Sequence, residues 1–316
     1  MDRLLKCKEG LREGLRRISE ELLRDLLQIM RQEKLTAERV HDARKVIKNL
    51  RATLRLTRGA LSDEARKARN QAFRNLAGPL SGPRDAAVTL ATFEKSYAEN
   101  LNGDSRPKAE TFWASKLQRS LADKAHASVP AESYQQATEE VRRLGGRLLP
   151  FEDARNGGGR SKTRDKDDWD STVSEGLRKT YHRGRGLARQ AAAKPKPSDE
   201  EWHELRKRVK DLGYQLTLFK KIKGVKPLLS KLDQVGTALG DARDLILLRD
   251  CLAKVQNKDE FTAAEGRNYH ALLIHVEDQN QKLHRRALKV IRGVYRPKSK
   301  RFTARLAKQF RRWQSG

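Results

Sequence analysis

The chain has 316 residues, of which 69 are Lys or Arg and 41 are Asp or Glu, so its formal net charge is +28. Charged residues make up 35% and hydrophobic residues 37%, a balance that supports packed helices and argues against wholesale disorder. There is no apolar run of about 18 residues, and the first residues lack the apolar core of a signal peptide, so we expect a cytoplasmic protein without membrane spans. This excess of positive charge predicts a polyanionic partner.

Two further classes are excluded by the cysteine and histidine patterns. Cys7 and Cys251 are the only cysteines and lie far apart, which excludes a disulfide framework and a zinc ribbon. Neither His41 nor His203 has a cysteine or second histidine beside it at ligand spacing, so neither a metal nor another cofactor is predicted.

Apolar residues recur at intervals of three and four almost throughout, and strict alternation is nearly absent, which predicts an all-α fold. We expect a first helix over about residues 4–32, a second after the capping residue Thr36 and a third after Ser62. Gly78–Pro83 is typical of a connector, with Pro83 as the first residue of a helix. Further helices are expected around residues 84–100, 108–127, 131–149, 171–193 and 262–295, after the capping box at Ser198, and after Pro297.

Residues 152–170 differ from the rest of the chain in composition. They combine alternating charges with the run Asn156–Gly159 and contain almost no apolar residue, which is typical of a linker. The sequence therefore predicts a first helical bundle at 1–151, a linker at 152–170 and a second bundle with C-terminal helices at 171–316.

The two halves repeat each other at an offset of 162 residues over their first two helices. Glu13–Arg17 matches Glu175–Lys179, and at the same offset His41, Arg44, Lys45 and Lys48 fall on His203, Arg206, Lys207 and Lys210. A few residues of length difference later, Arg84-Asp85 matches Arg243-Asp244. A constant offset over about 45 positions indicates an internal duplication.

The second helix of each repeat has a cationic face. Successive helical residues turn by about 100°, so the basic residues of the first copy share an arc of roughly 140° beside an apolar arc that contains Ile47 and Leu50. The cationic arcs contain His41, Arg44, Lys45, Lys48, Arg51 and Arg55 in the first copy, and His203, Arg206, Lys207, Lys210 and Lys220 in the second. Solvated surface is the alternative interpretation, but few carboxylates lie within i,i+4 reach, so the repeated stripe favours a ligand with closely spaced negative charges.

Other cations extend this set. Arg84 and Arg243 are each expected just inside a helix start, where free amides favour an anion; Asp85 and Asp244 are expected to orient basic side chains of neighbouring helices, with simple capping as the alternative. His41 and His203 either donate to phosphate oxygens or are structural. Further cations on the first helix of each half are Arg16, Arg17, Arg178, Lys179, Arg183 and Arg185.

The segments His41–Arg51 and His203–Lys210 resemble the twin signatures of the CHAD family, the conserved histidine α-helical domain. Gly176–Arg185 and Leu239–Asp244 also resemble that family's pattern, and Gly213 departs from it. The resemblance implies two four-helix bundles related by a pseudo-twofold axis, with a basic channel or groove between them that binds inorganic polyphosphate. It also implies association with polyphosphate granules.

We therefore predict a non-catalytic protein that binds polyphosphate and is targeted to polyphosphate granules, with polyphosphate-metabolising enzymes as further partners. A nucleic-acid binder is the first alternative, although the few aromatic residues do not interleave with the basic stripe as stacking platforms would. A polyphosphate-processing enzyme is the second, although no repeated nucleophile, carboxylate pair or glycine-rich phosphate loop occurs. The predicted binding residues are Arg16, Arg17, His41, Arg44, Lys45, Lys48, Arg51, Arg55, Arg84, Arg178, Lys179, Arg183, Arg185, His203, Arg206, Lys207, Lys210, Lys220 and Arg243.

Overall fold

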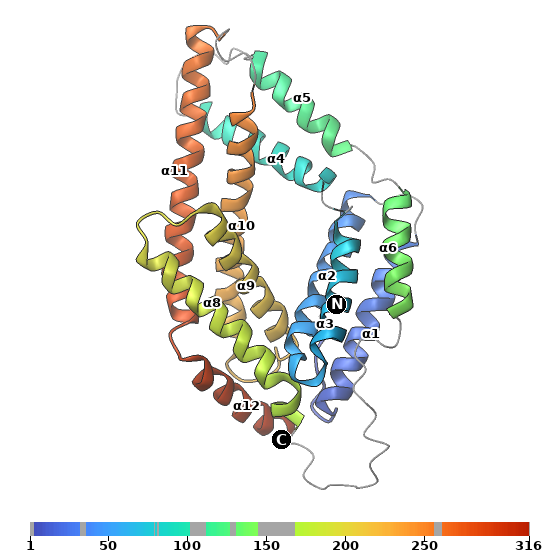
Figure 1. Ribbon diagram of the computed structural model, residues 1–316. Coiled ribbons are helices and arrows are strands. Elements are labelled where there is room, and N and C mark those ends of the chain that lie inside the picture. The colour runs from blue at the N-terminus through green and yellow to red at the C-terminus, as the bar shows by residue number, and fades with distance from the viewer. Residues whose placement is uncertain are drawn as a thin grey trace.

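The computed structural model describes residues 3–31, 36–78, 80, 82–101, 112–126, 131–144, 168–255 and 261–315. Within these ranges every regular element is a helix, as predicted (Figure 1). Most of the predicted linker, residues 152–167, lies outside the described part of the chain. The elements are α1 (Leu11–Met30), α2 (Ala37–Leu56), the 3-10 turn η1 (Arg58–Ala60), α3 (Asp63–Ala77), α4 (Gly82–Leu101), α5 (Phe112–His126), α6 (Ala131–Leu144), the π-helical turn η4 (Asp170–Ser174), α8 (Glu175–Ala193), α9 (Asp199–Thr217), α10 (Val225–Ala253), α11 (Ala263–Val294) and α12 (Ser299–Ser315).

Three predicted helix starts are confirmed by their caps. The Thr36 hydroxyl accepts a hydrogen bond from the Arg39 amide at 3.3 Å, and the Ser62 hydroxyl accepts one from the Ala65 amide at 3.1 Å. Ser198 forms the predicted capping box at the start of α9. These side chains satisfy amides that have no partner within their own helix.

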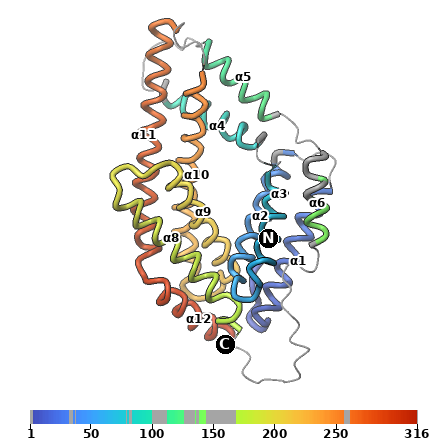
Figure 2. Tube along the Cα trace, viewed as in Figure 1, coloured from blue at the N-terminus to red at the C-terminus, as the bar shows by residue number. Residues whose placement is uncertain are grey.

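The helices α2 and α9 pack directly against each other where the two halves of the chain meet. On the outer side α1 packs on α2 and α8 packs on α9, and Figure 2 shows the same order as Figure 1. The apolar arcs predicted for the two central helices are confirmed, because Ile47, Leu50 and Leu212 are among the side chains buried in the core.

Close backbone contact joins the two halves at the end of α2. A Cβ atom at Gly176 of α8 would lie 2.1 Å from the Leu56 carbonyl oxygen, so only glycine fits at this crossing. The buried Gln215 side chain adds a polar link, since its amide donates to the Ala52 carbonyl and to the Thr180 hydroxyl, both at 3.2 Å. The interface between α2, α8 and α9 is therefore fixed in position.

The helices α4 and α5 pack with each other and reach across to α10 and α11 (Figure 1). Their contact is an aromatic cluster in which Trp113 lies edge-on to Tyr97 and to Tyr269, with ring centroids 5.9 and 5.5 Å apart. Leu248 and Leu272 of the second half are fully buried in the same cluster. Helices of the first half thus share a hydrophobic core with helices of the second.

Two predicted helix starts are wrong. The first helix begins at Leu11 rather than near residue 4; in the preceding segment the Leu5 amide donates to the Leu218 carbonyl at 3.2 Å. The second error concerns Arg243, which lies inside α10 because this helix continues without a break from Val225 to Ala253. Gly236 and Gly240 lie within this helix and allow α9 to approach it. Arg84 lies near the start of α4 as predicted.

Candidate functional site

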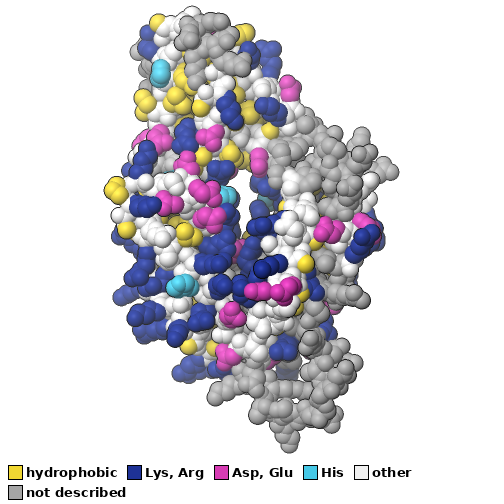
Figure 3. Space-filling view, viewed as in Figure 1, with side chains coloured by type: hydrophobic (Ala, Val, Ile, Leu, Met, Phe, Trp, Pro, Cys, Tyr) yellow, Lys and Arg dark blue, Asp and Glu magenta, His cyan; other side chains and the backbone are white. Residues whose placement is uncertain are grey.

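Five of the predicted binding residues come together between α2, α4 and α9. We call them the central cation cluster: Arg44 and Lys48 of α2, Arg84 of α4, and Arg206 and Lys210 of α9. The positive charges that act on Lys48 belong to the other four members. Figure 3 shows a hollow between α2 and α3 on one side and α9 and α10 on the other, with Lys and Arg side chains along its walls. Three helices that are distant in sequence therefore concentrate positive charge in one place.

Lys48 is the most strongly perturbed member of this cluster. Lys48 is exposed to solvent, yet partial burial inside the hollow, followed by the charges of Arg44 and Arg206, lowers its pKa from 10.5 to about 8. Loss of water and like charges both penalise the ammonium form. A bound anion would reverse the effect of the like charges, so the cluster is electrostatically suited to a ligand of high negative charge.

Carboxylates and carbonyls orient the arginines of the cluster. Arg44 donates to the Leu80 carbonyl at 2.8 Å, and its second terminal nitrogen lies 3.9 Å from an Asp85 oxygen. The prediction that Asp85 orients a basic side chain of a neighbouring helix is therefore confirmed. Burial raises the pKa of Asp244, while the nearby Arg206 acts to lower it. Asp85 and Asp244 thus act electrostatically on two arginines of the cluster.

The α9 members lie against the glycines of α10. A Cβ atom at Gly236 would be 2.9 Å from Lys210 Cε and Nζ, and one at Gly240 would be 3.5 Å from an Arg206 terminal nitrogen. Burial lowers the pKa of Lys210, whereas Asp233 of α10 acts to raise it. The small residues of α10 therefore leave room for the two cations of α9.

The two repeated histidines lie beside the cluster. Burial lowers the pKa of His41, and the charge of Arg84 adds to this effect. Burial also lowers the pKa of His203, followed by the charge of Lys207. Among the described residues the buried Nδ1 atom of His203 has no hydrogen-bond partner. Both imidazoles are therefore mainly neutral near pH 7 in the free protein, and direct contact with an anion stays a prediction.

Arg51 and Arg55 of the predicted stripe connect helices. Arg55 donates to Asp211 at 3.0 Å, and Arg208 lies 3.1 Å from the other oxygen of the same carboxylate. Arg51 donates to the Asn70 side chain of α3 at 3.0 Å. Burial and the charge of Arg55 lower the Arg51 pKa to about 10. These contacts hold α2, α3 and α9 together on the C-terminal side of the central cation cluster along α2.

Sequence reasoning missed three arginines that surround this junction. They are Arg66 and Arg74 of α3 and Arg208 of α9, whose charges add to burial in lowering the pKa of Arg55. Arg66 and Arg74 lie on α3, which has no counterpart in the aligned repeat, and Arg208 falls on Val46 at the repeat offset, so the repeat does not reveal these three cations. They enlarge the basic region beyond the predicted residues.

Several predicted residues are engaged elsewhere. Arg17 forms ion pairs with Glu9 at 2.6 Å and Glu21 at 3.0 Å, and Arg185 donates to the Tyr295 carbonyl at 3.1 Å. Lys207 pairs with Glu204, and the charge of Arg243 acts to lower the pKa of His203. Lys45 is exposed on α2, and Lys220 lines a pocket of about 450 Å³ together with Lys210. The remaining predicted residues are Arg16 on α1 and Arg178, Lys179 and Arg183 on α8. Arg16, Arg178, Lys179 and Arg183 thus lie on helices that do not carry the central cation cluster.

Two kinds of feature are absent from the described ranges. Across them, no group of three or more His, Cys, Asp or Glu side chains is arranged to hold a metal ion. Likewise no helix of this part of the chain is long and apolar enough to cross a membrane.

Comparison with known proteins gives the family. The protein-family model of the CHAD domain matches residues 9–253, so the chain belongs to the CHAD domain family. The crystal structure of the CHAD domain from the plant Ricinus communis is similar, with a TM-score of 0.60 and 18% identity over 94% of this chain and 95% of that one. PptA from Streptomyces chartreusis has a TM-score of 0.59 and 16% identity over 92% of this chain and 100% of its own. At these identities the likeness concerns the fold. No curated protein sequence matches the chain.

Proposed function

We propose that the protein binds inorganic polyphosphate through the central cation cluster. The observation that carries the proposal is the position of Lys48, whose four cationic neighbours come from three helices and help to lower its pKa. Arg44 and Arg206 would bind successive phosphates through paired N–H groups, and Lys48 and Lys210 would act as point charges. Binding would raise the pKa of Lys48, since the anion stabilises its charged form.

The wider arrangement follows from this proposal. The facing stripes of α2 and α9 would form a basic groove between two duplicated four-helix bundles, and the polymer would extend from the central cation cluster past His41 and His203. Bound polymer would target the protein to polyphosphate granules in the cytoplasm, where polyphosphate-metabolising enzymes would be further partners.

A ligand without bases is favoured by the positions of the aromatic side chains. Trp169 packs on Phe219 and Phe310 with ring centroids 5.3 and 5.0 Å apart, and these three rings and that of Tyr181 are fully buried. Rings engaged in this way cannot also stack on exposed bases of single-stranded nucleic acid. The central cation cluster therefore offers charge and little base recognition.

The experiment that tests this preference is a competition at physiological salt. Labelled polyphosphate bound to the protein is displaced with unlabelled polyphosphate, DNA or RNA of matched total charge. We expect at least tenfold higher concentrations of nucleic acid to be needed for half displacement. Equal displacement by nucleic acid would overturn the polyphosphate preference, whereas salt dependence alone would not, because both polymers release counterions.

We also propose that binding is non-catalytic. The central cation cluster consists of Arg and Lys side chains, and no nucleophile paired with a base takes part in it. Incubation with polyphosphate and Mg²⁺ should leave the chain-length distribution unchanged on a gel. Mg²⁺-dependent shortening that persists in highly purified protein would favour the enzyme alternative.

A further inference from the structure

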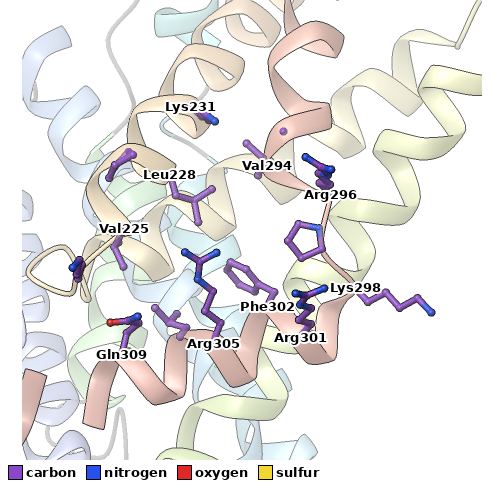
Figure 4. A pocket seen from close by; sticks show the side chains of 16 residues that line it. Val225, Leu228, Lys231, Val294, Arg296, Lys298, Arg301, Phe302, Arg305 and Gln309 are labelled. Atoms are coloured by element: carbon purple, nitrogen blue, oxygen red, sulfur yellow. The ribbon is translucent and has the colours of Figure 1, made fainter. Parts of the chain in front are cut away.

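A second basic pocket lies at the opposite end of α9 and α10 from the aromatic cluster, between the start of α10, the end of α11 and α12 (Figure 4). Its volume is about 950 Å³, in the upper part of the roughly 300–1,000 Å³ range of small-molecule sites. The left-handed Gly224, with φ +84°, turns the chain into α10 at one edge of this pocket. The matched family segment ends at residue 253, so the walls from α11 and α12 lie beyond it.

The charge of this pocket has one sign. No Asp or Glu is among its lining residues, and in the described part of the chain no ion pair engages its basic residues. The basic lining residues are Lys223, Lys231, Arg296, Lys298, Arg301 and Arg305. Lys231 reaches from α10 toward α11, where a Cβ atom at Gly293 would lie 3.7 Å from its Nζ. Six cations around one cavity repel each other unless an anion binds between them.

The floor of the pocket is apolar. Val225 and Leu228 line it from α10, Val294 from α11, and Phe302 and Leu306 from α12. In Figure 4, Phe302 and Arg305 extend from α12 toward Leu228 of α10, so apolar and cationic groups face the same space. One face of Phe302 stacks on Tyr181 at 4.0 Å with an interplanar angle of 11°, which fixes the orientation of its ring.

These two features together restrict the ligand. Bare polyphosphate would neutralise the cations but leave the apolar floor in contact with water. A purely apolar ligand would cover the floor but leave six positive charges unpaired. A molecule that carries adjacent phosphates on an aromatic or apolar body satisfies both, because burial of its body and pairing of its phosphates act together.

We propose that the pocket between α10, α11 and α12 binds a small nucleotide-like ligand, with its phosphates on Arg301, Arg305 and Lys231 and its ring system over Phe302 and Leu228. The site is separate from the central cation cluster and would give the protein a second, small-molecule input. The proposal does not depend on whether the central cation cluster binds polyphosphate.

The test uses ATP as the probe and removes the competing central site. The background is the full-length four-site variant, which carries Arg44→Ala, Lys48→Ala, Arg206→Ala and Lys210→Ala. Displacement of a fluorescent ATP analogue should show that ATP binds this variant at least tenfold more tightly than tripolyphosphate, which has the phosphates without the body. Adding Arg301→Ala and Arg305→Ala should weaken ATP binding at least tenfold.

A matched control variant loses the same number of positive charges as the test variant. Lys300→Ala and Lys308→Ala remove two exposed cations from the same helix outside the pocket, and we expect them to change ATP affinity less than twofold. Three outcomes would overturn the proposal: equal losses in test and control variants, equal binding of tripolyphosphate and ATP, and an acidic amphipathic peptide that occupies the site when ATP does not. Circular dichroism confirms that each variant retains its helix content.

Discussion

The helices α2 and α9 carry the same motif but meet different surroundings. Lys48 of α2 is surrounded by four cations, and its pKa falls to about 8. Its repeat partner Lys210 of α9 also has a lowered pKa because of burial, but Asp233 and Asp241 oppose the effect. Positions that match at the 162-residue offset therefore lie in different electrostatic surroundings, because the neighbours from α4 and α10 are not equivalent.

The C-terminal parts of α2 and α9 differ even more. In α2, Arg51 bonds to Asn70 and Arg55 to Asp211. In α9 the matching positions are Gly213 and Thr217, and a Cβ atom at Gly213 would meet nothing within 4 Å. One copy thus uses its cations to join helices, while the other leaves open space. The comparison predicts that α2 dominates the pH response of binding.

The largest expected effect of this difference is on pH dependence. Polyphosphate bound as proposed would raise the pKa of Lys48 above its free value of about 8. Titration of Lys48 would then leave affinity unchanged below pH 8 and would make it fall as pH rises above 8. A charge-assisted contact is worth about 1.5–3 kcal/mol, so affinity should fall about tenfold between pH 7.5 and 9.5. Calorimetric titration across this range measures the fall.

The matched variant for this prediction is Lys48→Arg. Arginine keeps its charge over the whole range, so the variant should lose less than threefold over the same pH interval. An equal fall in wild type and variant would assign the pH response to other groups.

Below pH 7, a further rise in affinity that is lost in His41→Gln would indicate that this histidine becomes charged on binding.

A smaller effect is expected on stability. The folded-state pKa of Lys48 lies below the unfolded value of 10.5, so the unfolded chain binds more protons between pH 8 and 10.5, and this group opposes folding below pH 8. Lys48→Met should therefore raise the melting temperature of the ligand-free protein by about 1–3 °C at pH 7 and weaken polyphosphate binding. The stability gain should be much smaller at pH 10, where Lys48 is mainly neutral in the folded protein; a gain that is the same at both pH values would contradict the electrostatic explanation.

The smallest effect is expected at the glycine that supports Lys210. A Cβ atom in Gly236→Ala would displace the Lys210 ammonium group, because it would lie 2.9 Å from Nζ, while helix propensity favours alanine. We expect polyphosphate affinity to fall about two- to threefold with no loss of melting temperature. Gly266→Ala on α11 is the control, since its Cβ meets nothing within 4 Å and should leave affinity unchanged. Equal affinity in both variants would show that Gly236 does not support the binding site.

Much of the fold was predictable because its signals are local. The caps at Thr36, Ser62 and Ser198 mark helix starts through contacts only three residues long. The uninterrupted course of α10 was not predictable from the repeat, because Arg243-Asp244 matches Arg84-Asp85, which does lie near a helix start. The aromatic contact between Trp113 and Tyr269 also joins residues far apart in sequence.

The site was predictable to the extent that it follows the repeat. The stripe residues Arg44 and Lys48 and their partners on α9 do come together, because one periodicity places them on one face of each helix. The role of Asp211 as the junction of Arg55 and Arg208 depends on the packing of α2 on α9, which no local pattern encodes. Charge patterning therefore identified the cations but not which of them are engaged within the fold.

The most direct test of the central cation cluster is polyphosphate titration of the four-site variant beside a control of equal charge. The control removes four exposed cations outside both proposed sites: Lys289, Arg292, Lys300 and Lys308, each changed to Ala. We predict at least a hundredfold loss of affinity in the four-site variant and less than threefold in the control, with unchanged helix content in both. Retained affinity in the four-site variant, or equal losses in the two proteins, would contradict binding by the central cation cluster.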